Sequence, residues 1–151
     1  MIQGKWIAPG QPLNEIRSIR SAVFSRPVDS VDPMGWNCLI LQNGQPAAAG
    51  RIWWSDGSFR LGDIGVLPEF RGQGLGDLAL RLLLFKAQSH AAREVRLQSP
   101  AETTGFFSRL GFREDSVPEH SELIEMVLPG SEIDLDTCKS CNRQNCPSRR
   151  P

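Results

Sequence analysis

Apolar and polar residues follow two different periods along the chain, and each period predicts its own kind of element. Apolar runs at residues 39–41, 47–54 and 59–66 are separated by Asn43-Gly44 and by Asp56-Gly57. Asn-Gly and Asp-Gly are the pairs that two-residue hairpin turns select, because both turn positions need a positive φ. The first half of the chain therefore predicts three antiparallel strands joined by tight turns.

Helical spacing marks two further segments. Apolar positions recur every three or four residues from Leu13 to Val23, between Pro12, which suits a first turn, and Pro27, which suits a stop. A longer stripe of about three turns lies in the second half of the chain. Its members are Leu75, Leu78, Ala79, Leu82, Leu83 and Lys86. We expect this longer helix to pack on the sheet.

Shorter patterns predict the remaining elements. Residues 2–7 predict an edge strand, residues 94–98 a short strand, residues 103–110 a helix and residues 121–128 a final strand. The long helix joins the strand that ends at Val66 to the strand that follows it. We therefore expect these two strands to lie parallel.

The composition is that of an ordinary globular chain. Its 151 residues suit a single domain, which we place at residues 1–129, and the polar remainder at 130–151 lacks periodicity and predicts a tail. The 17 basic residues are scattered and matched by 17 acidic ones, which disfavours a nucleic-acid surface. No segment approaches the ~20 apolar residues of a membrane span and no leader pattern opens the chain, so we expect a cytoplasmic protein without membrane contact.

The most informative motif is the group of glycines at the start of the long helix. Gly72, Gly74 and Gly76 leave main-chain N–H groups unshielded where the helix dipole favours an anion, and Arg71 adds a charge beside them. This loop predicts a pyrophosphate site. It is not a dinucleotide fingerprint, because Asp77 stands where the third glycine would be, and it lacks the Gly-Lys-Ser/Thr of a Walker A loop.

Three motifs in chain order resemble those of the GNAT N-acetyltransferase superfamily. The R-G-x-G-x-G run at residues 71–76 resembles its acetyl-CoA loop, residues 19–24 resemble the I-R-x-x-V-F of one bacterial branch, and residues 105–112 resemble its F-Y-x-x-L-G-F element. The order of the predicted elements from residue 2 to residue 128 is also similar. The resemblance implies an α/β fold of the α+β type, a mixed, mostly antiparallel twisted sheet flanked by helices on both faces.

The resemblance also implies a site for acetyl-CoA as cosubstrate. The pantetheine arm would lie where the strand ending at Val66 separates from its parallel neighbour, because main-chain groups that lose their partners there need others. The main-chain N–H of Val66 is the candidate donor to the oxyanion of a tetrahedral intermediate. The cosubstrate-binding residues implied in this way are Ile64, Gly65, Val66, Leu67, Arg71, Gly72, Gln73, Gly74, Leu75, Gly76, Phe106 and Phe107.

An amine acceptor must lose a proton before it attacks, because an amine with a pKa of ~10.4 is almost fully protonated at neutral pH. Asp63 is the first candidate for the base and Glu69 the second, although each also fits a solvated surface carboxylate. Many family members use a tyrosine to reprotonate the thiolate. Phe107 stands at that position, in a chain that has no tyrosine. Ser108, water or no group at all would then take that role.

The C-terminal tail holds a separate candidate. Cys138, Cys141 and Cys146 are spaced closely enough to converge on one soft metal ion. A closed structural zinc site takes four ligands, so Cys38, His120 or a partner molecule would supply the last. The other interpretation is a tail whose cysteines are incidental.

These observations predict an acyltransferase that moves an acetyl group from acetyl-CoA to a primary amine of a small molecule or protein by direct attack. The acceptor would lie against residues 25–36 and 114–120. Two alternatives stay open: a catalytically silent acyl-CoA-binding regulatory module, and a metal-binding interaction protein that uses the tail cysteines. The sequence also allows a homodimer.

Overall fold

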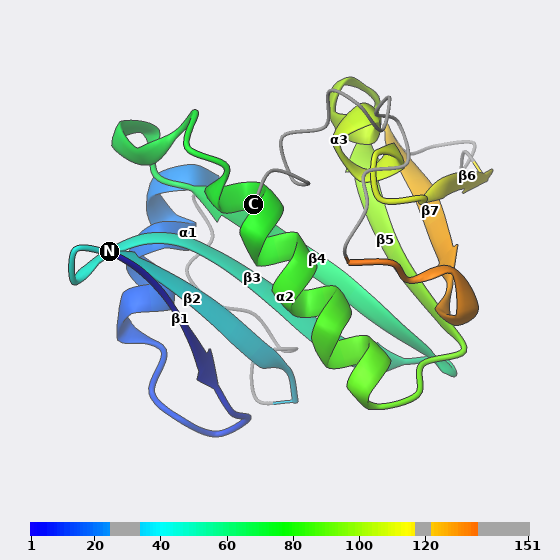
Figure 1. The fold of residues 1–151 in the computed structure, drawn as a ribbon, viewed down its shortest axis with the longest axis horizontal. Coiled ribbons are helices and arrows are strands. Elements are labelled where there is room, and N and C mark those ends of the chain that lie inside the picture. Colours follow the sequence, from blue (N-terminus) through cyan, green and yellow to red (C-terminus); the bar gives the residue numbers. More distant parts are fainter. Residues whose placement is uncertain (25–33, 117–121, 136–151) are drawn as a thin grey trace.

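The computed structural model describes residues 1–24, 34–116 and 122–135, and this part of the chain forms a sheet of seven strands with helices on both faces (Figure 1). The strands are β1 (Ile2–Ile7), β2 (Trp36–Gln42), β3 (Gln45–Ser55), β4 (Ser58–Val66), β5 (Glu94–Pro100), β6 (Arg113–Ser116) and β7 (Leu123–Pro129), in the order β1-β2-β3-β4-β5-β7-β6. The helices are α1 (Asn14–Phe24), α2 (Leu75–Ser89) and α3 (Thr104–Ser108). The mixed, mostly antiparallel sheet that the sequence predicts is confirmed.

Both predicted hairpins are present. Gln42 pairs with Gln45 across the β2–β3 turn, and Ser55 pairs with Ser58 across the β3–β4 turn. All four turn residues have a positive φ: 52° at Asn43, 80° at Gly44, 52° at Asp56 and 81° at Gly57. Two left-handed residues in succession match the right-handed twist of the flanking strands. The Asn-Gly and Asp-Gly pairs therefore set the register of the first half of the sheet.

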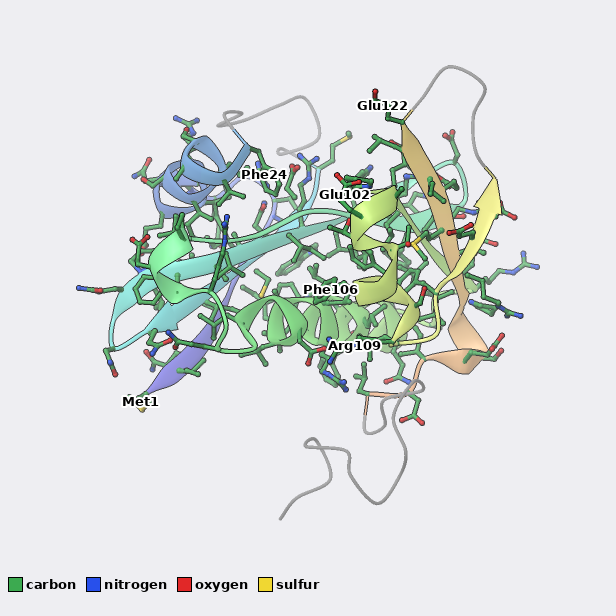
Figure 2. The ribbon with its side chains drawn as sticks, turned by 90° about the horizontal axis from the view of Figure 1, so that it is seen from above. Met1, Phe24, Glu102, Phe106, Arg109 and Glu122 are labelled. Atoms are coloured by element: carbon green, nitrogen blue, oxygen red, sulfur yellow. The ribbon has the colours of Figure 1, made fainter. Side chains whose placement is uncertain are left out.

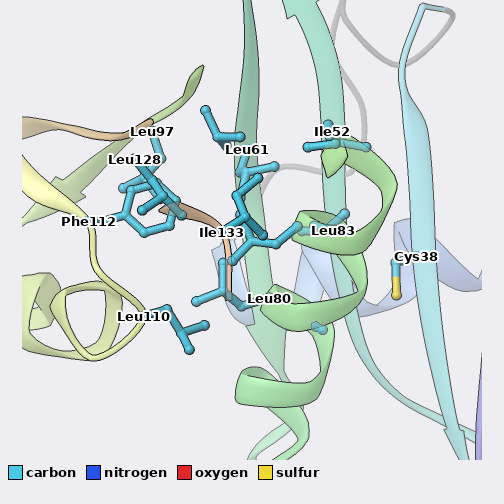
Figure 3. Close-up of a cluster of buried hydrophobic side chains, with 14 of the residues drawn as sticks. Cys38, Ile52, Leu61, Leu80, Leu83, Leu97, Leu110, Phe112, Leu128 and Ile133 are labelled. Carbon is cyan, nitrogen blue, oxygen red and sulfur yellow. The ribbon is translucent and has the colours of Figure 1, made fainter. Parts of the chain in front are cut away.

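α1 and α2 cover opposite faces of the sheet (Figure 2). Alternation along β2 makes both faces apolar, because Cys38 and Ile40 are buried in the core under α2 while Leu39 is buried in the cluster under α1. The core under α2 is the larger one, and Figure 3 shows Leu80 and Leu83 reaching into it from the helix. The two layers hold β3 and β4 between them, so these strands are fixed from both sides.

β4 and β5 are parallel and pair only at their beginning, through Phe59 with Val95 and Arg60 with Arg96. Beyond these positions the strands separate, and Figure 1 shows the gap widening toward the glycine loop and α3. β5 instead pairs along its whole length with β7. The expected parallel arrangement and its separation are both confirmed, and the separation divides the sheet into two halves.

The second half of the sheet differs from the sequence expectation in one strand. Residues 114–120 were expected as a turn against the acceptor, but Glu114 lies in β6 and pairs with Met126 of β7. β6 is an edge strand with the polar sequence Arg-Glu-Asp-Ser, so it has no apolar alternation by which to recognise it. Residues 117–121 lie outside the described part of the chain.

Packing against the domain continues past Pro129. Ile133 is 7% exposed and belongs to the core under α2. Gln88 donates a hydrogen bond to the carbonyl oxygen of Ile133, and Arg81 donates one of 2.6 Å to that of Leu135. The separate tail at residues 130–151 stays a prediction, but two of its first six residues, Ile133 and Leu135, are bound to α2 by these hydrogen bonds. None of the described helices is both long and apolar enough to cross a membrane.

Candidate functional site

A cavity of about 570 Å³ lies where β4 and β5 separate. Leu61 and Leu97 point from these strands into the core under α2, so their neighbours Arg60 and Gln98 point to the face that carries α1. All four line the cavity, which therefore passes from one face of the sheet to the other. The described lining residues are Phe24, Arg51, Trp53, Arg60, Leu61, Gly62, Asp63, Ile64, Leu97, Gln98, Pro100, Thr103, Phe106, Phe107 and Leu123.

The main chain at the end of β4 faces this gap. The N–H of Leu67 donates a hydrogen bond of 2.9 Å to the carbonyl oxygen of Ala47 in β3, and its carbonyl accepts one of 2.9 Å from Phe70. Leu67 is thus already paired. Because successive residues of an antiparallel strand direct their N–H groups to opposite sides, the N–H of Val66 points away from β3 and toward the gap. This is the direction that the proposed oxyanion contact requires.

The glycine loop leaves the start of α2 open to solvent. Gly72 and Gly74 have φ values of 82° and 77°, which L side chains rarely adopt, and no side chain caps the helix. The first hydrogen bond of the helix runs from Leu78 to the carbonyl oxygen of Gly74. Arg71 donates a hydrogen bond of 3.2 Å to the carbonyl oxygen of Val66, which holds its guanidinium beside the loop. Gly72, Gln73 and Gly74 are exposed.

Two contacts show how this loop could accept an anion and where it lies relative to the cavity. Asp77 lies in the first turn of α2, where its charge would repel a phosphate, but Arg81 donates it a hydrogen bond of 2.7 Å. Gly76 lies beside the cavity: a Cβ there would be 3.5 Å from Val66 Cγ2 and 3.7 Å from Phe106 Cζ. The end of β4, the start of α2 and α3 therefore meet at Gly76.

Asp63 faces the cavity and is the only carboxylate among its described lining residues. Its φ is 51°, at an irregularity in the pairing of β3 with β4 that lies between Ala49 and Arg51. Its Oδ2 lies 3.1 Å from Arg51 Nη2 and 3.8 Å from Arg20 Nε. Both arginine side chains are at most 5% exposed. Glu69, the second candidate base, is exposed in the 3₁₀ turn Pro68–Phe70 and does not line the cavity.

An ionic network joins the two halves of the sheet beside the cavity. Arg60 of β4 donates two hydrogen bonds, of 3.0 and 2.8 Å, to Glu125 of β7, and Arg96 of β5 donates one of 3.2 Å to the same carboxylate. The hydrogen bonds from Arg60 hold the pKa of Glu125 below its usual value. Glu94 also has a lowered pKa, through hydrogen bonds from Arg96 and Ser58. Sequence patterns did not signal this network, because its members lie on three strands.

The residue at the position where the resemblance implies a tyrosine carries no hydroxyl. Phe107 lines the cavity there, next to Phe106. Ser108 is exposed, its hydroxyl donates a hydrogen bond of 2.9 Å to the carbonyl oxygen of Thr104 in its own helix, and it does not line the cavity. Thr103 carries the only hydroxyl among the described lining residues, and its Oγ1 lies 2.7 Å from the Oγ of the buried Ser99.

The described residues show no metal centre. No group of three or more histidine, cysteine, aspartate or glutamate side chains in residues 1–24, 34–116 and 122–135 could hold a metal ion. Cys38 is buried, and burial raises the pKa of its thiol to about 12. His120 and the tail cysteines Cys138, Cys141 and Cys146 lie outside the described residues.

Comparisons with known proteins agree with this geometry. The chain is similar to an acyl-CoA N-acyltransferase from Pseudomonas aeruginosa, with 20% identity, a TM-score of 0.76 and coverage of 84% of this chain and 99% of that one. It is also similar to the ribosomal-protein-S18-alanine N-acetyltransferase of Escherichia coli, with 22% identity, a TM-score of 0.70 and coverage of 85% and 94%. A GNAT family acetyltransferase from Elizabethkingia anophelis with acetyl-CoA bound gives 16% identity, a TM-score of 0.70 and coverage of 85% and 97%.

At these identities the solved structures show a common fold. No curated protein matches the sequence significantly. The family model described as "Acetyltransferase (GNAT) domain" matches residues 35–114, more than half of the 151-residue chain, from the start of the central strands through the glycine loop and α3. On this match, together with the fold and the glycine loop, the chain belongs to the GNAT acetyltransferase family.

Proposed function

We propose that this chain is an N-acetyltransferase that moves the acetyl group of acetyl-CoA to a primary amine by direct attack. The observation that carries the proposal is the cavity at the separation of β4 and β5. The carboxylate of Asp63 and the ring of Phe106 line it, and Gly76, in the uncapped first turn of α2, lies beside Phe106 and Val66.

The two ends of acetyl-CoA would use different parts of this site. The pyrophosphate would accept hydrogen bonds from main-chain N–H groups of the loop from Gly72 to Gly76, where the helix dipole and Arg71 both favour negative charge. The pantetheine arm would follow β4 between Ile64 and Val66, under Phe106 and Phe107 of α3. This arrangement brings the thioester carbonyl to the N–H of Val66.

The transfer forms one C–N bond and breaks one C–S bond. The nitrogen of the neutral amine attacks the thioester carbonyl carbon, and the N–H of Val66 donates a hydrogen bond to the oxyanion that forms. The C–S bond then breaks and the sulfur keeps the electron pair. The proton of the attacking nitrogen passes to Asp63, directly or through a water molecule. Asp63 then gives a proton through water to the thiolate, so coenzyme A ends as the thiol and Asp63 as the carboxylate.

The missing tyrosine is compatible with this sequence of steps. A coenzyme A thiol resembles a cysteine thiol, with a pKa of ~8.5, so it can leave as a thiolate without a general acid. General acids contribute roughly 10²–10⁴ in rate. We therefore expect slow but real turnover rather than an inactive module.

Release of free thiol from acetyl-CoA tests the proposal. The full chain is incubated with acetyl-CoA and a panel of primary amines, and the free thiol and the acetylated amine are measured together. An enzyme forms both in equal amounts. A silent acyl-CoA-binding module would bind acetyl-CoA in titration calorimetry and form neither, and that result would replace the proposed function.

A further inference from the structure

We infer that the acceptor half of the cavity is a subsite for a small primary amine carried on an apolar, preferably aromatic, body, and that Trp53 is the side chain that selects it. This inference rests on the proposed acetyl transfer. It concerns the part of the cavity on the face of the sheet that carries α1, where Trp53 of β3 and Gly62 of β4 are neighbours.

The side chain of Trp53 is half-buried and lines the cavity, and residues from two strands contact its ring. A Cβ at Gly62 would lie 3.1 Å from Cη2 and 3.2 Å from Cζ3 of the indole, closer than side chains normally approach. The ring therefore lies against bare main chain, and a larger residue at Gly62 would have to displace it. The guanidinium of Arg51 lies 4.6 Å from the ring centroid, within the range of a cation–π contact.

A second ring lies over β4 beyond the carboxylate. A Cβ at Gly65 would be 2.9 Å from Cε2 of Phe24, the last residue of α1. Along this face of β4, Gly62 lies under Trp53 and Gly65 lies under Phe24, with Asp63 between the two glycines. An amine whose nitrogen approaches Asp63 therefore has aromatic surface beside it for its carbon body.

The charges of the cavity disfavour an acceptor that carries several positive charges. Asp63 is the only carboxylate among the described lining residues, and it already has Arg51 and Arg20 nearby. Glu125, just outside the lining, accepts hydrogen bonds from Arg60 and Arg96. A polyamine carries several positive charges, which would meet these arginines. A single amine on an apolar body meets less of that repulsion, is uncharged in the form that attacks, and gains aromatic contact.

The size of the cavity suits a small molecule. Its volume of about 570 Å³ falls within the roughly 300–1,000 Å³ of pockets that enclose one small ligand. The pantetheine arm would occupy part of this space. What remains can enclose an amine with one ring, so phenethylamine is a suitable probe.

Kinetics with three amines test the subsite. Phenethylamine, ethylamine and spermidine are compared as acceptors at saturating acetyl-CoA, and we expect phenethylamine to have the highest kcat/KM. W53A should lower kcat/KM for phenethylamine tenfold or more, through KM, and change that for ethylamine less than threefold. W53F should recover part of the loss. A preference for spermidine, or an equal loss with all three amines, would overturn the inference.

The neighbouring tryptophan provides the matched control. Trp54 lies on the opposite face of β3, is 57% exposed, packs edge-on against Phe59 and does not line the cavity. W54A should therefore leave all three acceptors within twofold of the original chain. A W54A loss equal to that of W53A would show that the effect comes from the stability of β3, and would contradict the subsite.

A binding measurement separates this inference from the proposed function. Equilibrium dialysis of radiolabelled phenethylamine against the full chain saturated with coenzyme A needs no turnover. Binding to the original chain and to W54A, with a tenfold or greater loss in W53A, supports the subsite even if no acetylated amine forms. No saturable binding, or equal binding to all three proteins, overturns the subsite even if other amines are acetylated.

Discussion

The two halves of the cavity are built from different chemical groups. The proposed cosubstrate half, which extends beyond the cavity, would use main-chain N–H groups from one continuous stretch, from Val66 through the glycine loop to the start of α2. The acceptor half uses side chains from several elements, with Trp53, Asp63 and Phe24 as its main surfaces. Main-chain groups can recognise the same cosubstrate in many sequences, whereas each side chain of the acceptor half can change alone. We therefore expect the acceptor half to decide which amine is used.

The electrostatic character of the halves differs as well. The loop offers an uncapped helix start, and the nearest carboxylate, Asp77, is neutralised by Arg81. In the acceptor half the carboxylate of Asp63 lies beside two buried arginines. The loop thus offers donors for an anion, whereas the other half holds a carboxylate whose charge is already shared with two arginines. Substitutions in one half should therefore change the affinity for acetyl-CoA or the affinity for the amine, but not both.

Loss of the carboxylate in the acceptor half should have the largest effect. We expect Asp63→Asn to lower kcat/KM by roughly 10²-fold and to change the acidic limb of its pH profile, because the amine proton loses its acceptor. Asparagine tolerates the positive φ of 51° at this position. Acetyl-CoA affinity in calorimetry should stay within a few-fold. A near-normal rate would assign the proton to water, and a parallel loss of acetyl-CoA affinity would show that Asp63 acts on both halves.

A side chain in the loop should produce the opposite result. Gly74 has a φ of 77° and lies at the start of α2, where the pyrophosphate would approach the main chain. We expect Gly74→Val to weaken acetyl-CoA binding tenfold or more in titration calorimetry. Gly10 also has a positive φ and open space around it, far along the chain from the loop, so Gly10→Val is a matched control for backbone strain. Equal affinities in both variants would show that the loop is only a turn.

The ionic network between the half-sheets should contribute to stability in a pH-dependent way. Glu125 has a lowered pKa because Arg60 donates hydrogen bonds to its carboxylate. Its contribution is therefore full above the ordinary glutamate pKa of about 4.3 and is lost as the pH falls through the lower folded value. Glu125→Gln should lower the free energy of unfolding by about 1–3 kcal/mol at pH 7, and by less at pH 3.

Denaturant unfolding at the two pH values measures this difference. Glu132→Gln removes one partner of the exposed pair with Arg113, whose side chains are 64% and 43% exposed, and serves as the control. Exposed pairs contribute about 0–1 kcal/mol. If Glu125→Gln costs no more than this control at pH 7, the network does not hold the two half-sheets together.

Removal of the residues after Leu135 should have the smallest effect on either half. A chain cut there keeps Ile133 and Leu135, which pack on α2, and should bind acetyl-CoA within twofold of the full chain. The remaining thiol, Cys38, should resist thiol reagents at pH 8 until the chain is denatured, because burial raises its pKa to about 12. A tenfold loss of affinity would place the tail in the site. Zinc or iron bound by the full chain and lost on truncation would support the metal-binding tail.

The same division explains what the sequence could predict. The glycine loop and the two hairpin turns are contiguous, and each is recognisable from a few neighbouring residues with special φ requirements. The surroundings of Asp63 are not contiguous. They depend on the irregular register between β3 and β4 and on Arg20 from α1 and Arg51 from β3. No local pattern encodes that meeting, so Asp63 was predicted from its place before the loop, without its partners.

Other features that the sequence did not reveal also depend on the folded sheet or on an exposed turn. β6 was missed because its four polar residues form an edge strand that gains its pairing from β7. Glu69 was a reasonable second base by its distance from the loop in sequence, but the 3₁₀ turn at Pro68–Phe70 leaves it exposed. Trp53 could have been suspected only from its place three residues before the second turn, and Trp54 next to it fits equally well. Burial and register, which separate the two tryptophans, come from the folded sheet.

Backbone amide signals report most directly on the central claim, that acetyl-CoA lies between β4 and β5 with its pyrophosphate on the glycine loop. In ¹H–¹⁵N correlation spectra of the full chain titrated with acetyl-CoA, we expect the largest shifts at Val66, Gln73, Gly74 and Gly76. The amides of β1, on the far edge of the sheet, should move little. Saturable shifts that leave Val66 and the loop unchanged, or no saturable shifts at all, would contradict the account.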